Sequence, residues 1–177
     1  MKIVVVGPGA IGSLFAAYLA KSKEEIWLLD KSSQRAAKLN ECGISLEGSS
    51  ASWQSKPKVT ANPQDIGQAD LIIICVKSFD TKLAIEKIKP LLNQETKILT
   101  LQNGIGNVEI ISELVGQERV IAGVTNEGAT LIDIGKIRHA GRGETIIGAI
   151  DGKTPVALRT IREIFNKVGF NCKMSRD

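Results

Sequence analysis

Three closely spaced glycines near the start of the chain constrain its fold more than any other feature. They occur in the segment KIVVVGPGAIG, where Gly7, Gly9 and Gly12 fit the pattern G-x-G-x-x-G. A short β-branched run precedes them, and the apolar residues after them recur with the spacing of an amphipathic helix. A strand, a glycine turn and a helix in this order predict the first βαβ unit of a dinucleotide-binding fold.

Each glycine in this turn has a physical role that a larger residue does not fill. Gly7 permits the tight turn, Gly9 lets a pyrophosphate approach the backbone, and Gly12 lets the helix pack closely against the strand. The free N–H groups and partial positive charge at the helix start attract the phosphates. We therefore predict that the cofactor-binding segment consists of Gly7, Pro8, Gly9, Ala10, Ile11 and Gly12.

The alternation of strand and helix continues along the chain. Apolar runs predict further strands at residues 26–30, 71–76, 97–101 and 120–124. Helical spacing predicts helices at residues 10–21, 33–41, 81–92 and 107–115. Ser33 is the predicted N-cap of the second helix, and Gly43 is its predicted stop. This order predicts an α/β fold with a Rossmann-type, doubly wound and mostly parallel sheet.

Two segments depart from this alternation. Short polar and apolar alternations in residues 44–62 predict small antiparallel strands or loop. The glycine-rich sequence of residues 125–150 predicts short strands joined by tight turns. A last helix is predicted to run from Pro155 to residue 168, and residues 170–173 predict a closing strand. We therefore expect antiparallel strands to be added to the parallel sheet near the C-terminus.

Composition and charge narrow the class of protein. The chain has 177 residues, of which 43% are apolar and 4% aromatic, and this suits one domain with an aliphatic core. Its net charge of +4 comes from scattered Lys and Arg residues, so nucleic acid is not an expected partner. No uninterrupted apolar stretch reaches the roughly 18 residues of a membrane helix, and no signal peptide is recognisable.

The cysteines and the single histidine predict the compartment and argue against a metal site. Cys42, Cys75 and Cys172 form no C-x-x-C pair, and three is an odd number for a disulfide framework. His139 alone does not complete a zinc site with such spacings. We therefore expect a soluble cytoplasmic protein with free thiols and no metal.

The end of the second strand carries two residues that argue in opposite directions about the cofactor. Asp30, eighteen residues after Gly12, stands where an acid hydrogen-bonds the ribose of NAD and repels the 2′-phosphate of NADP. Lys31 follows it and would attract that phosphate. From these two residues alone both cofactors stay open, and Lys31 can equally be an ordinary exposed lysine.

Two further polar residues follow predicted strands. Lys77 comes after the strand at residues 71–76, and Asn103 comes after the strand at residues 97–101. Ligands of open parallel sheets bind at the carboxyl ends of the strands, so both residues are placed to face the nicotinamide half of a cofactor. The alternatives are a solvated lysine and an Asn-Gly turn chosen for its backbone conformation.

Four segments together resemble one enzyme family. GPGAIG, VKSFDT, LQNGIGNVE and AGVTNEGATLIDIGKIRHAGRGETIIG, in this order, are similar to the N-terminal domain of ketopantoate reductases over about residues 1–172. Members of that family use NADPH to reduce the 2-oxo acid ketopantoate to pantoate, on the route to pantothenate and coenzyme A. The resemblance implies this reaction, NADP(H) rather than NAD(H), and an NADP-binding domain over residues 1–177.

The resemblance also implies roles for individual residues. Lys31 lies where the family carries a basic residue for the 2′-phosphate. Lys77 and Asn103 match family positions beside the cofactor, and Asn103 is also expected to bind the substrate. Ala129 matches a backbone contact near the nicotinamide, whereas His139 is expected to have a structural role.

The family's second, helical domain supplies a catalytic lysine and much of the substrate pocket, and it is expected after residue 177. Lys173 lacks the helical context of that lysine, so no catalytic residue is expected in this chain. The chain alone should bind cofactor but turn over little. Two alternatives stay open: another NAD(P)-dependent hydroxy-acid dehydrogenase, and a non-catalytic dinucleotide-binding module. A homodimer is compatible with an apolar face left uncovered.

Overall fold

The computed structural model describes residues 1–48, 52–150 and 156–175, and its centre is an eight-stranded sheet. The strands of this sheet are β1 (Lys2–Val6), β2 (Glu25–Leu29), β5 (Lys58–Thr60), β6 (Leu71–Ile74), β7 (Lys97–Thr100), β8 (Val120–Thr125), β11 (Glu144–Ala149) and β12 (Asn171–Met174). They lie in the order β12-β11-β8-β7-β6-β1-β2-β5. All neighbours from β5 to β8 are parallel, and their order is that of a doubly wound dinucleotide-binding fold.

The last two strands extend the sheet beyond β8. Strand β11 pairs with β8 in antiparallel orientation, and β12 pairs in parallel with β11. The predicted fold class, a mostly parallel doubly wound sheet with added antiparallel strands, is therefore confirmed. The predicted closing strand lies one residue later than expected, at Asn171–Met174.

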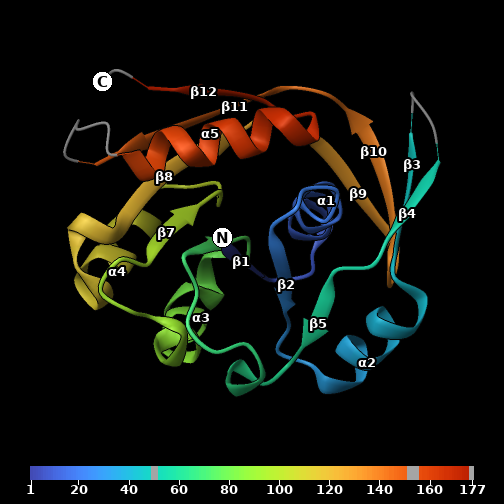
Figure 1. The fold of residues 1–177 in the computed structure, drawn as a ribbon, viewed down its shortest axis with the longest axis horizontal. Coiled ribbons are helices and arrows are strands. Elements are labelled where there is room, and N and C mark those ends of the chain that lie inside the picture. The colour runs from blue at the N-terminus through green and yellow to red at the C-terminus, as the bar shows by residue number, and fades with distance from the viewer. Residues whose placement is uncertain (49–51, 151–155, 176–177) are drawn as a thin grey trace.

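Helices cover both faces of the sheet, as Figure 1 shows. The α-helices are α1 (Ala10–Leu19), α2 (Ser33–Cys42), α3 (Thr81–Ile88), α4 (Asn107–Val115) and α5 (Val156–Val168). The short 3₁₀ helices are η1 (Pro63–Asp65), η2 (Ser78–Asp80), η3 (Lys89–Leu91) and η4 (Gln117–Arg119). Helices α1 and α5 pack on one face, and α3 and α4 pack on the other. No helix in the described part of the chain has the length and apolar character needed to cross a membrane.

Alternate side chains of β1 enter two separate cores. Ile3 and Val5 belong to the cluster under α1 and α5, whereas Val4 and Val6 belong to the cluster under α3 and α4. Successive side chains of a strand point to opposite faces, and helices bury both faces here. This double burial explains why the segment KIVVV is continuously apolar rather than alternating.

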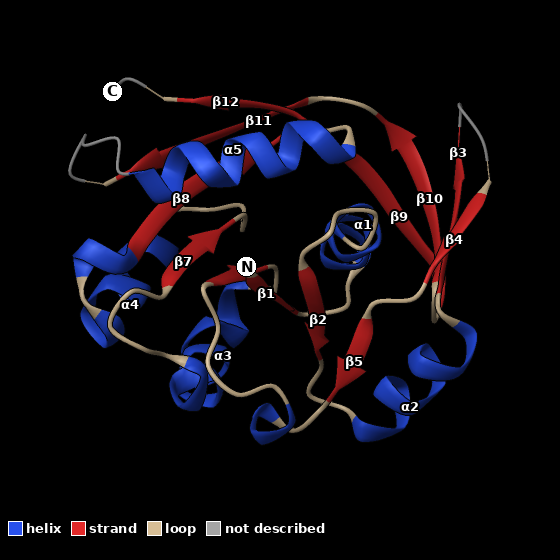
Figure 2. Cartoon of the chain, in the orientation of Figure 1, coloured by secondary structure: helices blue, strands red, loops and turns tan. Residues whose placement is uncertain are grey.

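A second sheet of four strands packs against α1 (Figure 2). Its strands are β3 (Ile44–Gly48), β4 (Trp53–Ser55), β9 (Gly128–Asp133) and β10 (Lys136–Gly141), in the order β4-β3-β10-β9. The antiparallel pairs β3–β4 and β9–β10 agree with the predicted short strands. The parallel pairing of β3 with β10 was not predicted, because it joins residues such as Glu47 and Arg138 that lie 91 positions apart.

The start and end of α2 test two predictions about helix caps. Ser32, rather than the predicted Ser33, is the N-cap, because its side chain accepts a hydrogen bond from the Arg35 N–H at 3.2 Å. Gly43 ends the helix as predicted, with a φ of 68° that favours glycine.

Three other boundaries differ from expectation or lie outside the structure. Strand β5 belongs to a segment predicted as antiparallel strands or loop, but it extends the main sheet in parallel beside β2. Helix α3 ends at Ile88 rather than at residue 92, because Pro90 lacks the N–H that would continue its hydrogen bonding. The predicted helix start at Pro155 lies outside the described residues.

Candidate functional site

A cavity of about 470 Å³ opens at the carboxyl ends of β1, β2 and β6. Strand β1 lies between β2 and β6 in the sheet. After β1 the chain first adds β2 on one side, and later adds β6 on the other side. Open α/β sheets bind ligands at such a switch point. The cavity is lined by Val6, Gly7, Pro8, Gly9, Leu29, Asp30, Lys31, Arg35, Cys75, Val76, Lys77, Phe79, Asp80, Leu83, Ala84, Lys87 and Leu131.

The glycine turn after β1 contributes to this lining. Gly7 has a φ of +99°, and a Cβ there would lie 2.8 Å from Val76 Cγ1. A Cβ on Gly12 would overlap the carbonyl oxygen of Gly7, so α1 approaches the turn too closely for a side chain. A Cβ on Gly9 would meet nothing within 4 Å, so open space lies in front of that residue. The turn thus has the geometry predicted for each of the three glycines.

The start of α1 presents its positive end beside this open space. Gly9 is the N-cap of α1 and has an extended backbone, and the first turn carries no acidic residue. The first N–H groups of a helix have no partner within the helix, so they carry a partial positive charge. Ala10, Ile11 and Gly12 form this first turn, outside the cavity lining. An anion placed against Gly9 would meet the positive helix end.

Asp30 does not stand alone at the end of β2. Its carboxylate is fully buried and accepts two hydrogen bonds from the guanidinium of Arg35. The Ser32 N–H donates to the same carboxylate at 3.1 Å, and Lys87 Nζ donates to the Asp30 carbonyl at 2.9 Å. The hydrogen bond with Asp30 raises the pKa of Arg35 above its usual value, so the guanidinium keeps its positive charge beside the carboxylate.

Arg35 was not identified from the sequence. The available signal was a cation in the first turn of the helix that follows the acidic strand end. The sequence does not reveal that the guanidinium turns back onto the Asp30 carboxylate, because an arginine side chain in the first turn of a helix can point in many directions.

Lys31 lies in the same cavity and is paired there. Its side chain is 73% exposed, and its Nζ lies 3.1 Å from Oδ2 of Asp80. Asp80 comes from η2, which follows β6, so the ion pair connects the two strands that flank β1. Lys31 therefore has the exposure of an ordinary surface lysine but a specific partner at the cavity.

Lys77 and Asn103 lie on neighbouring loops. The side chain of Lys77 is exposed and contributes to the cavity lining, whereas Asn103 lies outside that lining. Ser78, the residue after Lys77, donates from its Oγ to the Asn103 carbonyl at 3.1 Å. The structure thus brings together the two loops that were predicted to face the nicotinamide half of a cofactor.

Buried Asn107 holds these two loops in place, and it was not identified from the sequence. Its Nδ2 donates to the Asn103 carbonyl at 3.2 Å and to Ser78 Oγ at 3.3 Å. Its Oδ1 accepts a hydrogen bond from Thr81 Oγ1 at 3.0 Å. Gly104 has a φ of +101°, so the Asn-Gly turn interpretation describes the backbone correctly. The exposed side chain of Asn103 stays accessible to a ligand.

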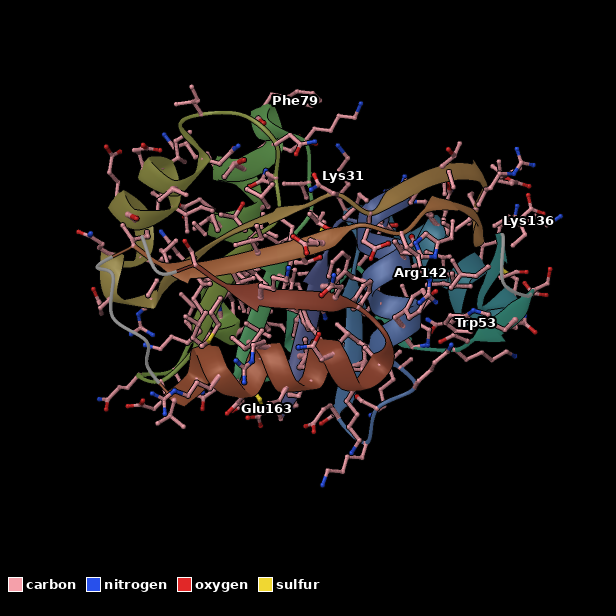
Figure 3. The ribbon with its side chains drawn as sticks, turned by 90° about the horizontal axis from the view of Figure 1, so that it is seen from above. Lys31, Trp53, Phe79, Lys136, Arg142 and Glu163 are labelled. Carbon is pink, nitrogen blue, oxygen red and sulfur yellow. The ribbon has the colours of Figure 1, made fainter. Side chains whose placement is uncertain are left out.

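Part of the cavity lining is apolar and exposed. Phe79 and Leu83 are 79% and 71% exposed, and Leu131 reaches the same cavity from β9. Figure 3 shows Lys31 and Phe79 toward one edge of the molecule, with Glu163 of α5 at the opposite edge. Large apolar side chains at a cavity suit a flat organic ring, while the helix end suits phosphates.

Ala129 and His139 face each other across the β9–β10 pair, outside the cavity lining. Ala129 is half-buried against the core. His139 is buried, with its Nδ1 3.1 Å from Tyr18 Oη and its Nε2 2.6 Å from Glu127 Oε2. These contacts agree with the structural role expected for His139.

Lys173 and the cysteines add no reactive group to the cavity. Lys173 forms an ion pair with Glu144 of the neighbouring strand. Cys75 lines the cavity, but burial raises the pKa of its thiol to about 12, so it stays protonated at neutral pH.

The sequence of this chain is similar to those of a known protein family. A sequence model described as "Ketopantoate reductase PanE/ApbA" matches residues 3–152. A 2-dehydropantoate 2-reductase from Halobacterium salinarum is 34% identical over 170 residues, which cover 96% of this chain and 56% of the relative. The chain therefore spans a little over half the length of that relative.

Solved structures share the fold. The crystal structure of 2-dehydropantoate 2-reductase from Geobacter metallireducens matches with a TM-score of 0.93 at 29% identity, over 100% of this chain and 58% of that chain. A ternary structure of D-mandelate dehydrogenase with NADH and anilino(oxo)acetate matches with a TM-score of 0.90 at 27% identity, over 99% of this chain and 57% of that chain.

Proposed function

The chain belongs to the ketopantoate reductase family, and from this we propose that it is the cofactor-binding part of an enzyme that reduces 2-dehydropantoate to pantoate with NADPH. The observation that carries the proposal is the coincidence of family membership with a cavity at the switch point, beside an open helix N-terminus. In the family, this reaction serves pantothenate and coenzyme A biosynthesis.

The cavity residues fit a dinucleotide. The turn from Gly7 to Gly12 would hold the pyrophosphate, since open space lies in front of Gly9 at the positive end of α1. The exposed Phe79 and Leu83 would cover the adenine ring. NADPH, when bound, supplies the hydride, so the task of these residues is to bind and orient it.

Two features at the end of β2 support NADP(H) over NAD(H). The Asp30 carboxylate accepts two hydrogen bonds from Arg35, so its oxygens are not free to bind the ribose hydroxyls. The positive charge of Arg35 also offsets the repulsion that Asp30 would exert on a 2′-phosphate. Lys31 is exposed and would provide a cation for that phosphate. In this assignment Asp30 serves the cofactor indirectly, by positioning Arg35.

We assign Lys77 and Asn103 to the nicotinamide and substrate end of the site. The Lys77 cation is suited to a phosphate, a ribose hydroxyl or the carboxylate of a 2-oxo acid, and the Asn103 amide to the ribose or the substrate. Asn107 supports this by holding the loop backbone at Asn103. Ala129 is assigned a backbone contact, which is supported by the presence of Leu131, from the same strand, at the cavity.

The remaining chemistry is proposed to come from a helical domain that follows residue 177. The matched relative is longer, since this chain covers 56% of it. In the proposed enzyme a lysine of that domain polarises the 2-oxo carbonyl and protonates the developing alkoxide. The residues of the present chain bind the cofactor and orient the 2-oxo acid.

The proposal also covers how the protein associates and the compartment in which it acts. Val124 and Ile146 are exposed opposite each other on β8 and β11, and they offer an apolar surface for a second copy in a homodimer or for the second domain. The three cysteines are free thiols, which supports a reducing, cytoplasmic setting.

A second candidate function is an NAD-dependent hydroxy-acid dehydrogenase. It is favoured by the likeness to D-mandelate dehydrogenase, which was solved with NADH. The two candidates differ in the preferred cofactor and in the side chain of the 2-oxo acid.

Calorimetric titration of the chain with NADPH and, separately, with NADH tests the proposal. We expect NADPH to bind several-fold more tightly. Tighter binding of NADH would favour the second candidate, and binding of neither would contradict the assigned site. In the protein with its second domain, ketopantoate should be the best substrate in a panel of 2-oxo acids, whereas a preference for an aromatic 2-oxo acid would favour the second candidate.

A further inference from the structure

An ion pair crosses the carboxyl end of β1, and we propose that its acidic member, Asp80, sets the preference between NADPH and NADH through Lys31. The Nζ of Lys31 lies 3.1 Å from Oδ2 of Asp80, although the two residues are 49 positions apart. Lys31 follows β2 and Asp80 follows β6, the strands on either side of β1. We call this pair the Lys31–Asp80 bridge. The inference rests on the proposed cofactor function.

The charged groups around the bridge differ in how firmly they are held. Among the described residues, Asp30 and Asp80 are the carboxylates that line the cavity. Asp30 is fully buried and is held by two hydrogen bonds from Arg35. The side chains of Lys31 and Asp80 are 73% and 26% exposed, and a single short contact joins them. A buried two-point pair persists, whereas an exposed single-contact pair exchanges readily with solvent ions and ligands.

The other lysines of the cavity are less suited to capture a phosphate at this end. Lys87 already donates from its Nζ to the Asp30 carbonyl at 2.9 Å. Lys77 begins the loop whose next residue, Ser78, donates a hydrogen bond to the Asn103 carbonyl, so it lies toward the end assigned to the nicotinamide. Arg35 also lines the cavity, but its guanidinium is held by two hydrogen bonds to Asp30. Lys31 is therefore the cation that a 2′-phosphate would recruit, and Asp80 competes with the phosphate for it.

The two cofactors make different demands on the bridge. NADH carries a hydroxyl at the 2′ position, which can lie beside an intact, neutral ion pair. NADPH carries a phosphate there, which must draw Lys31 away from Asp80 or share it with a second anion. Asp80 thus opposes NADPH binding and leaves NADH binding almost unchanged. It is a positioning residue that acts through Lys31.

Asp80 can be changed without removing a contact that the helix needs. It is the N-cap of α3, but its side chain makes no capping hydrogen bond among the described residues. Asp80→Asn keeps the size of the side chain and removes its charge. Glu86→Gln is the matched control, because Glu86 lies on the same helix, pairs with Lys89 at the surface and is outside the cavity lining.

The test is calorimetric titration with NADPH and with NADH at one ionic strength. The proteins are the unsubstituted chain, Asp80→Asn, Lys31→Met, the double variant and Glu86→Gln. Asp80→Asn should raise the affinity for NADPH by about threefold to tenfold, since one competing charge is lost, and should change the affinity for NADH by less than about twofold. In the Lys31→Met background the gain should fall below about twofold, and Glu86→Gln should leave both affinities unchanged.

Salt provides a second readout. Screening weakens an exposed charge pair, so the NADPH affinities of the unsubstituted chain and of Asp80→Asn should converge as salt is raised. Three results would contradict the proposed role of Asp80 and leave the proposed function intact. Asp80→Asn could raise the affinities for both cofactors equally, or could raise the NADPH affinity by the same factor in the Lys31→Met background. The ratio of the NADPH affinities of Asp80→Asn and the unsubstituted chain could also stay constant as salt is raised. Binding of neither cofactor by the unsubstituted chain would overturn the proposed function, and the bridge with it.

Discussion

The guanidinium of Arg35 holds the buried carboxylate of Asp30 by two hydrogen bonds at the end of β2. An acid at this position of a dinucleotide-binding fold is ordinarily taken as the ligand of the ribose hydroxyls. Here its oxygens are already engaged, and the positive charge beside it comes from the next helix. Removing either member of the pair would therefore leave the other without its opposite charge, beside the proposed cofactor site.

Replacing Arg35 with Met should destabilise the fold, because the carboxylate of Asp30 would stay buried without its partner. Breaking a fully buried pair costs about 3–5 kcal/mol, and since Arg35 is partly exposed we expect about 1–3 kcal/mol. Urea unfolding measures the change. The double variant Asp30→Asn with Arg35→Met should recover part of the loss. An Arg35→Met protein as stable as the unsubstituted chain would contradict the prediction.

Gly9→Ala should weaken binding of both NADPH and NADH by at least about tenfold, because its methyl group would occupy the space that the pyrophosphate requires. The fold should be unaffected, since this methyl group meets no protein atom within 4 Å. Gly141→Ala is the matched control, because its Cβ also meets nothing within 4 Å and lies outside the cavity lining. Calorimetry gives the affinities and thermal unfolding checks the fold. Unchanged affinity in Gly9→Ala would argue against the assigned phosphate position.

Asn107→Ala should loosen the loop that carries Asn103. The substitution removes the hydrogen bonds to the Asn103 carbonyl, Ser78 Oγ and Thr81 Oγ1. Losing these hydrogen bonds, one of which joins Asn107 to the buried Thr81 hydroxyl, should cost about 1–3 kcal/mol of unfolding free energy. Hydrogen exchange at Gly104, Ile105 and Gly106 should become faster. Ser112→Ala, on the same helix, should leave that exchange unchanged, and equal acceleration in both variants would refute a specific role for Asn107.

The three thiols should differ sharply in reactivity. Burial raises the pKa of both Cys75 and Cys172 to about 12, so almost none of either thiol is ionised near neutral pH. Cys42 is exposed. A thiol reagent should therefore modify one cysteine quickly, and Cys42→Ser should abolish this fast phase. The rates at Cys75 and Cys172 should rise about tenfold per pH unit until the fold is lost. Rapid modification of three thiols in the folded chain would contradict the burial.

The ion pair between Glu144 and Lys173 should stabilise the chain only above acidic pH. The hydrogen bond from Lys173 lowers the pKa of Glu144 below its usual value. A carboxyl group whose pKa is lowered by folding contributes stability above its unfolded pKa and loses it as the pH falls through the folded value. Glu144→Gln should thus lower the urea midpoint slightly at about pH 7 and not at about pH 3. An equal difference at both pH values would show that the charge is not responsible.

The main sheet could be predicted from the sequence because its signals are local. The apolar run of β1, the glycine turn and the periodicity of α1 lie within the first twenty residues, and each was placed correctly to within two residues. The small sheet was predicted only in part. The turn between β9 and β10 is local, but the pairing of β3 with β10 depends on how the whole chain folds around α1.

By itself, the sequence determined that the chain begins a dinucleotide-binding fold, and it placed Lys31 and Lys77 at the ends of the right strands. Only the tertiary structure decided the partners of these residues. Parallel strands from distant parts of the chain end at one edge of the sheet, so Asp80 reaches Lys31 across β1. The direction of a side chain and the distance to its partner depend on packing, which is why the pairing of Asp30 with Arg35 and the contacts of Asn107 became visible only in three dimensions.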